Sequence, residues 1–192
     1  MAAFGVVVVA ASLGGRAVIE EVLAPLPRDF PAAILVVQHI RGDQPSYLAE
    51  LLARRLQLAV HGATMGARLL AGHVYTAVPG RHLVIARTDD GVGACVLSDG
   101  LAVNFSRPSA DPLFASAAEA FGARALGVVL TGALCDGAAG ADALRAAGGT
   151  VIAQLPSTCR AAGMPLAAIR RDAVDHILAP AAITAALVRL VR

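Results

Sequence analysis

Apolar positions along the chain alternate between short continuous runs and longer segments with helical spacing. Continuous runs rich in β-branched residues are typical of strands buried on both faces of a parallel sheet. Such runs lie at residues 4–10, 33–38, 125–130 and 150–154. Apolar residues three or four positions apart predict helices. Segments with this spacing lie at residues 15–26, 45–56, 111–121, 137–147 and 180–191.

The stretch 61–98 has a different pattern, because its β-like pieces are short and broken by glycines. A piece at 74–75 stands alone, whereas 83–86 and 94–97 flank a turn and predict an antiparallel hairpin. Elsewhere strands and helices alternate, which indicates parallel pairing with right-handed crossovers. The pattern therefore predicts an α/β fold, a three-layer αβα sandwich with a mostly parallel, doubly wound sheet and one antiparallel hairpin insertion. No repeat or linker divides the chain, so we expect residues 1–192 to form a single domain.

Composition narrows the class of protein and its partners. The chain is 57% hydrophobic and 16% charged, which is typical of a globular protein and not of a disordered one. Its net charge is only +2, and its basic residues are scattered arginines, so nucleic acid is not an expected partner. Three widely spaced cysteines argue against both a disulfide framework and a thiolate zinc site, and they favour the cytoplasm. The apolar N-terminal run is too short to span a membrane, so we expect no membrane insertion.

Candidate catalytic residues follow three of the predicted strands. Ser12 comes after the first strand, His39 after the second and Asp136 after the third strong buried run. In an open parallel sheet, ligands bind outside the carboxyl ends of the strands, so neighbouring strands would bring these side chains into one cleft. A serine hydroxyl needs a base to remove its proton, histidine titrates near neutrality, and a buried aspartate orients the imidazole. The pattern favours a serine hydrolase.

Each residue also fits a simpler role. Ser12 precedes Gly14 and Gly15, and a serine at such a turn often binds an anion or caps a helix. The turn lacks the G-x-G-x-x-G spacing and the Walker lysine of nucleotide sites. His39 fits a hydrogen-bonded histidine at a strand end, and Asp136 fits a helix N-cap. The order Ser, His, Asp and the sequence around Ser12 also differ from the α/β-hydrolase elbow.

Several motifs in order make the chain resemble the catalytic domain of the CheB family, the chemotaxis-receptor protein-glutamate methylesterases. They lie at residues 11–15, 36–39, 75–83, 103–111, 130–137 and 163–165. The resemblance assigns Ser12 as nucleophile, His39 as general base and acid, and Asp136 as the carboxylate that orients His39. The candidates for the oxyanion hole are the backbone amides near Leu13 and Ala133, the latter by similarity to the family.

The resemblance also implies a substrate and partners. It implies hydrolysis of glutamate methyl esters on the cytoplasmic helices of methyl-accepting chemotaxis receptors, deamidation of certain receptor glutamines, and a reaction that needs neither metal nor cofactor. Arg107 is expected at the border of the cleft, where it would guide an acidic receptor surface. Its alternative role is that of a structural arginine that holds its loop.

Four departures from the family pattern surround the predicted site. Leu13 replaces a threonine, the pair Ala133-Leu134 replaces Met-Gly, Ser106 replaces a histidine, and Ser157 stands where an acidic residue is common. If the turn requires a positive φ at Leu134, the leucine would be strained. These changes keep two alternatives open: a receptor- or partner-binding homologue with weakened catalysis, and a small-molecule esterase.

Family members typically carry an N-terminal phosphorylatable receiver domain, whereas this sequence starts directly at the first predicted strand of the catalytic domain. Three explanations fit that difference. The first is that the enzyme is constitutive. The second is that a separate response-regulator or kinase partner controls it, and the third is that the sequence is a fragment.

Overall fold

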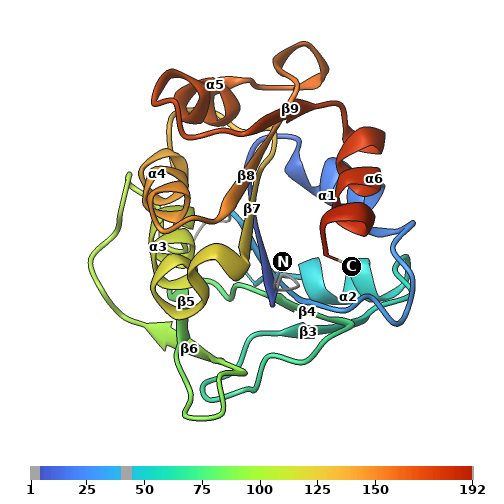
Figure 1. Cartoon of the computed structure of the whole chain (residues 1–192), viewed down its shortest axis with the longest axis vertical. Coiled ribbons are helices and arrows are strands. Elements are labelled where there is room, and N and C mark those ends of the chain that lie inside the picture. The colour runs from blue at the N-terminus through green and yellow to red at the C-terminus, as the bar shows by residue number, and fades with distance from the viewer. Residues whose placement is uncertain (1–4, 40–44, 192) are drawn as a thin grey trace.

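A seven-stranded, entirely parallel sheet runs through the centre of the molecule (Figure 1). The structure is a computed structural model that describes residues 5–39 and 45–191. The strands lie in the order β3-β4-β2-β1-β7-β8-β9. Their bounds are β1 Val6–Ala11, β2 Ala33–Gln38, β3 Ala59–Gly62, β4 His73–Thr76, β7 Ala125–Val129, β8 Thr150–Gln154 and β9 His176–Leu178. Phe4, the expected start of the first strand, lies outside the described residues.

Helices cover both faces of this sheet. One face carries α1 (Gly15–Leu23), α2 (Leu48–Ala53) and α6 (Pro180–Leu190). The other carries α3 (Ala110–Phe121), α4 (Ala138–Ala146) and α5 (Gly163–Arg170). Figure 1 shows the two groups of helices on opposite sides of β7 and β8. The predicted three-layer sandwich with a doubly wound parallel sheet is confirmed.

Strand β1 shows why its sequence is apolar at every position. Side chains alternate between the two faces of a strand, so Val6 and Val8 pack under α3 and α4, while Val7 and Val9 pack under α1 and α6. All six residues of β1 are completely buried. Burying a valine side chain contributes roughly 1.5–3 kcal/mol, so the strand that leads into Ser12 is anchored firmly from both sides.

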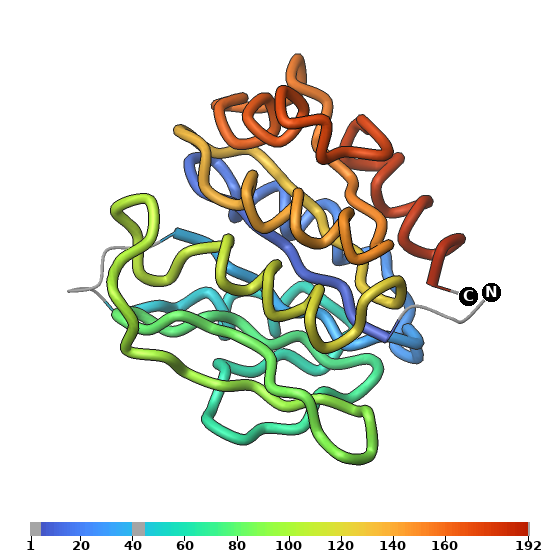
Figure 2. Tube along the Cα trace, turned by 60° about the vertical axis from the view of Figure 1, so that its left-hand side comes forward, coloured from blue at the N-terminus to red at the C-terminus, as the bar shows by residue number. Residues whose placement is uncertain are grey.

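The predicted hairpin is confirmed as a separate two-stranded antiparallel sheet of β5 (His82–Ala86) and β6 (Ala94–Ser98). It packs against α3, beside which the green segment lies in Figure 2. By contrast, the isolated piece at 74–75 belongs to β4, which pairs with β2 inside the main sheet.

Strands β3 and β9 and helix α5 are not predicted by the apolar pattern. The two strands are the edges of the sheet and most of their residues are exposed, so neither contains a buried apolar run. Helix α5 spans only eight residues, so its apolar pattern covers little more than two turns. Single 3-10 turns lie at Gly122–Arg124 and Pro156–Thr158. Helix α2 is shorter than the predicted segment 45–56.

Candidate active site

The central strands bring the three predicted residues to one edge of the sheet. Because β1 lies between β2 and β7, the segments that follow these strands are neighbours, as the sequence predicts. The Ser12 N–H donates to the carbonyl of Thr131 at 3.0 Å, and the His39 N–H donates to the carbonyl of Ala11 at 3.0 Å. These backbone bonds extend the sheet pairing by one residue and hold the two turns together.

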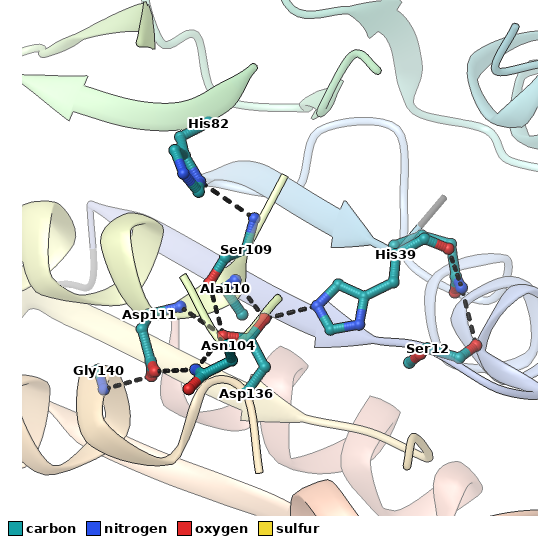
Figure 3. A network of polar contacts seen from close by, with 10 residues as sticks. Ser12, His39, His82, Asn104, Ser109, Ala110, Asp111, Asp136 and Gly140 are labelled. Carbon is teal, nitrogen blue, oxygen red and sulfur yellow. Dashed lines mark hydrogen bonds and ion pairs between the residues drawn. The ribbon is translucent and has the colours of Figure 1, made fainter. Parts of the chain in front are cut away.

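His39 and Asp136 are joined by a short hydrogen bond. The distance from His39 Nε2 to Asp136 Oδ2 is 2.5 Å, and the ring is oriented by it (Figure 3). Because a carboxylate accepts, Nε2 carries the proton in the neutral ring and Nδ1 is left as the acceptor. In Figure 3 this second nitrogen is turned toward Ser12. In the described part of the chain, no hydrogen bond joins the Ser12 hydroxyl to His39, a loose arrangement that is common in unliganded sites.

The Asp136 carboxylate is 1% exposed and receives several further hydrogen bonds. The donors are Ser109 Oγ at 2.6 Å, the Ala110 N–H at 2.7 Å and Asn104 Nδ2 at 3.0 Å. Burial raises the pKa of Asp136, but the hydrogen bonds from His39, Ala110, Ser109 and Asn104 outweigh burial and lower the pKa to about 2. The carboxylate is therefore ionised at neutral pH and can stabilise a protonated His39.

The contacts of Asp136 also bear on its alternative role as a helix N-cap. The cap of α4 is Gly137, with φ of 87° and no side-chain hydrogen bond. The carboxylate instead accepts from the N–H groups of Ala110 at 2.7 Å and Asp111 at 3.4 Å, in the first turn of α3. A negative charge at a helix N-terminus is favourable. Asp136 thus caps a helix from a distant loop and orients His39 at the same time.

A second layer of polar residues, which the strand-end reasoning does not find, holds this carboxylate. Asn104 Nδ2 also donates to Asp111 Oδ2 at 2.7 Å. Burial raises the pKa of Asp111, and the nearby charge of Asp136 adds to that rise. The Ser109 N–H donates to Nδ1 of the buried His82 at 3.2 Å, which ties the hairpin to the site. The sequence signals for this layer are the cluster of polar residues just before α3 and the family motif at residues 103–111 that contains them.

Gln38 and Thr131 set the shape of the turn that carries Ser12. Gln38 Nε2 donates to the Ser12 carbonyl at 2.7 Å, and Thr131 Oγ1 donates to the Leu13 carbonyl at 3.0 Å. Gly14 has a φ of 80°, a left-handed conformation that favours glycine. Side chains from β2 and from the segment that follows β7 therefore fix the carbonyl groups of Ser12 and Leu13.

The predicted oxyanion donors are the backbone N–H groups of Leu13 and Ala133. Within residues 5–39 and 45–191, neither the Leu13 nor the Ala133 N–H donates a hydrogen bond to another group. Unpaired backbone N–H groups beside a nucleophile are what a developing oxyanion requires. The neighbouring Leu134 has a φ of 64° and is 71% exposed, so the expected strain at this position is present. A left-handed leucine costs roughly 1–2 kcal/mol.

A cleft of about 520 Å³ opens in front of Ser12. Its lining residues are Ser12, Leu13, Gly14, Gly15, Arg16, Ala17, Gln38, His39 and Arg160. Arg107 is not among the described residues that line this cleft, and its guanidinium donates to the carbonyls of Asp99 at 3.1 Å and Gly100 at 2.9 Å. These contacts agree with the structural role weighed for Arg107.

No group of three or more histidine, cysteine, aspartate or glutamate side chains among the described residues is arranged to hold a metal ion. No helix in the same residues has both the length and the apolar character needed to cross a membrane.

Comparison with known proteins shows which protein family the chain is similar to. The family model described as CheB methylesterase matches residues 7–187. The chain is 46% identical to a protein named protein-glutamate methylesterase/protein-glutamine glutaminase 2 of Anaeromyxobacter dehalogenans, over 97% of this chain and 53% of that protein. It is 40% identical to a protein-glutamate methylesterase/protein-glutamine glutaminase of Chromohalobacter salexigens, over 96% of this chain and 51% of that protein. The chain thus spans about half the length of these curated relatives.

A solved structure supports the same placement. The catalytic domain of the Thermotoga maritima CheB methylesterase superimposes with a TM-score of 0.93 at 33% identity, covering 98% of this chain and 100% of that one. The family model, the curated relatives and this structure agree along nearly the whole sequence. The chain belongs to the CheB methylesterase family.

Proposed function

We propose that the chain is a protein-glutamate methylesterase that hydrolyses glutamate methyl esters on chemoreceptors and also deamidates receptor glutamines. The observation that carries the proposal is the 2.5 Å contact between His39 and Asp136, with the second ring nitrogen turned toward Ser12 beside an open cleft. The names of the curated relatives, which include both activities, support the choice of substrate.

Acylation begins with Ser12. Its Oγ attacks the ester carbonyl while His39 Nδ1 takes the hydroxyl proton, because Nε2 is held by Asp136. The negative oxygen of the tetrahedral intermediate is held by the N–H groups of Leu13 and Ala133, and each such donor typically contributes a factor of roughly 100–1,000 in rate. The ionised Asp136 stabilises the imidazolium that forms.

Acylation ends when His39 gives its proton to the leaving methanol, which leaves an acyl ester on Ser12. In deacylation a water molecule attacks that ester while His39 accepts one of its protons. His39 then returns this proton to the Ser12 oxygen, which leaves as the alcohol. The products are methanol and a glutamate carboxylate. With a glutamine substrate the same steps release ammonia, and no metal or cofactor takes part.

The proposal extends to location and partners. The substrate is placed on the cytoplasmic helices of methyl-accepting chemotaxis receptors, so the protein would act in the cytoplasm, where its three free thiols are stable. A separate response regulator or kinase is one source of control. The described strands and helices match one catalytic domain along nearly the whole chain, which supports treating them as a single domain.

The test is methanol release from methylated receptor fragments by the purified chain. Ser12→Ala and His39→Gln should each lower the rate by at least about 1,000-fold, since triad members act as a unit. Ser98→Ala, in the hairpin, is a matched serine control and should release methanol at the wild-type rate. Equal rates for wild type and Ser12→Ala would end the proposal.

One observation favours the alternative of a binding homologue. Leu134 is strained directly beside the oxyanion donor Ala133, which could disturb the hole without affecting receptor binding. Receptor binding without any Ser12-dependent methanol release would support that alternative. Ser12-dependent cleavage of a p-nitrophenyl ester alone would instead support a small-molecule esterase.

A further inference from the structure

Two arginines line the cleft together with Ser12 and His39. Arg16 is the second residue of α1, and Arg160 lies between the 3-10 turn Pro156–Thr158 and α5. They come from opposite ends of the sequence, yet both line the cleft in front of Ser12. No aspartate or glutamate is among the described residues that line it. The cleft therefore carries positive charge beside the nucleophile.

Arg160 is positioned by the turn that follows Ser12. A Cβ atom built on Gly14 would lie 2.8 Å from Arg160 Cβ and 2.9 Å from Arg160 Cδ. The aliphatic stem of Arg160 thus lies directly across the Cα of Gly14, which long arginine side chains favour because the stem is apolar. The absence of a side chain at Gly14 serves the left-handed turn and also leaves room for Arg160.

The charges of these two arginines are not used within the described structure. Five other arginines each lie within 4 Å of an acid, namely Arg55, Arg68, Arg81, Arg145 and Arg171, whereas some exposed arginines away from the cleft, such as Arg28 and Arg54, have no such partner among the described residues. Across residues 5–39 and 45–191, neither Arg16 nor Arg160 has an ion pair or a side-chain hydrogen bond. The carboxylate of Asp136 is buried and already accepts hydrogen bonds from His39 and Ser109.

We propose that Arg16 and Arg160 bind a carboxylate of the substrate protein, so that the enzyme prefers a glutamate ester with an acidic neighbour on the same helix face. The inference rests on the proposed function. Arginine matches carboxylate geometry because its planar fork can donate two parallel hydrogen bonds. On a helix, residues three or four positions apart lie next to each other, about 5–6 Å between Cβ atoms. The ester can then reach Ser12 while its acidic neighbour meets the arginines.

The physics of this contact predicts which kinetic constant it changes. The acidic neighbour does not react, so it binds equally well in the ground and transition states, and it lowers KM more than it raises kcat. The arginines are exposed, so the attraction is screened by salt. The preference should be large at low ionic strength and should fade as salt is added.

The experiment compares two helical peptides that each carry one glutamate γ-methyl ester, with either glutamate or glutamine four residues away. Wild type should show a kcat/KM about tenfold higher for the acidic peptide, the size expected for two exposed charge contacts. The ratio should shrink between about 0.01 M and about 1 M salt, where the screening length falls from about 30 Å to about 3 Å. The double variant Arg16→Gln/Arg160→Gln should bring the ratio close to one.

Two further variants separate a specific contact from general charge. Arg189→Gln removes the same charge from the last turn of α6, whose end lies near the start of β1 and away from Ser12, so it should keep the wild-type ratio (Figure 1). Arg16→Glu/Arg160→Glu should reverse the preference toward a peptide with lysine at the neighbouring position. A wild-type ratio near one, or a preference that persists in the double glutamine variant, would overturn the inference.

A binding measurement tests the arginine contact independently of the proposed catalytic function. The Ser12→Ala chain cannot acylate, but it should bind the acidic peptide more tightly than the neutral one by the same factor. If wild type hydrolyses neither peptide while Ser12→Ala still discriminates between them, the proposed function fails and the arginine contact stands. If hydrolysis depends on Ser12 but neither assay discriminates, the arginine contact fails alone.

Discussion

Replacing Asp136 by asparagine tests the central contact of the site. The substitution keeps the shape of the side chain but removes its charge, and it replaces one accepting oxygen by an NH₂ group. His39, Ser109, Asn104 and the Ala110 N–H all donate to that carboxylate at 2.5–3.0 Å. An amide oxygen can accept from only part of this set, and its NH₂ group would face other donors. The variant should therefore lose both stability and catalysis.

The size of the stability effect follows from the pKa of Asp136. Hydrogen bonding lowers that pKa from 3.8 to about 2 in spite of burial. At about 1.4 kcal/mol per pH unit, this difference corresponds to about 2 kcal/mol. Since the pKa is lower in the folded state, the contribution is complete above pH 3.8 and is lost as the pH falls toward about 2. The asparagine variant has no such contribution to lose.

The assay is urea unfolding of both proteins between about pH 5 and about pH 2. The difference in unfolding free energy between wild type and Asp136→Asn should shrink by about 2 kcal/mol over that range. Asp142→Asn, an exposed acid on α4 paired with Arg171, controls for removing a carboxylate and should leave the pH dependence nearly unchanged. Parallel pH profiles for wild type and Asp136→Asn would refute the reasoning.

The same variant should lose activity through His39. Without the carboxylate, the imidazole can adopt the wrong tautomer and the imidazolium is no longer stabilised, an effect worth roughly 10⁴ in kcat for a triad. KM should change little, because Asp136 is buried and does not line the cleft. A variant with kcat within tenfold of wild type would show that Asp136 does not serve His39 in this way.

Three other variants probe the support of the site. Ser109→Ala removes a donor 2.6 Å from Asp136 and should cost about 1–2 kcal/mol in urea unfolding, with an acid-unfolding midpoint at higher pH. Gly132→Ala would place a Cβ 2.0 Å from Met164 Sδ. It should cost about 1–3 kcal/mol and shift the nearby nucleophile, so methanol release should fall more than stability alone explains. Leu134→Gly relieves a left-handed conformation and should raise the unfolding free energy by up to about 1 kcal/mol, whereas an unchanged or lower value would argue against strain there.

The sheet was largely readable from the sequence because its central strands are buried on both faces. The segments 33–38 and 150–154 are predicted with the bounds that the structure gives them. Their continuous apolar runs exist because side chains on both sides of the strand enter a core. The edge strands β3 and β9 escape prediction for the opposite reason, since exposed residues there leave no apolar run.

The candidate site was likewise predictable from the sequence only in part. Ser12, His39 and Asp136 can be selected from the sequence because each follows a buried strand, and parallel strands present their carboxyl ends at one edge. Which strands are neighbours, however, depends on the order β2-β1-β7, and that order is a property of the whole sheet. Local spacing also leaves the partner of Asp136 open between a helix cap and a histidine.

Local sequence therefore determined the buried strands, most helices, the hairpin and the three side chains at the strand ends, because burial and turn geometry leave patterns over a few residues. Only the tertiary structure decided that Asp136 caps α3 while it orients His39, that Ser109 and Asn104 hold it, and that Arg107 binds carbonyls instead of lining the cleft. It also brought Arg160 across Gly14. These contacts join residues far apart along the chain, and a hydrogen bond or charge between them leaves no periodic trace in the sequence.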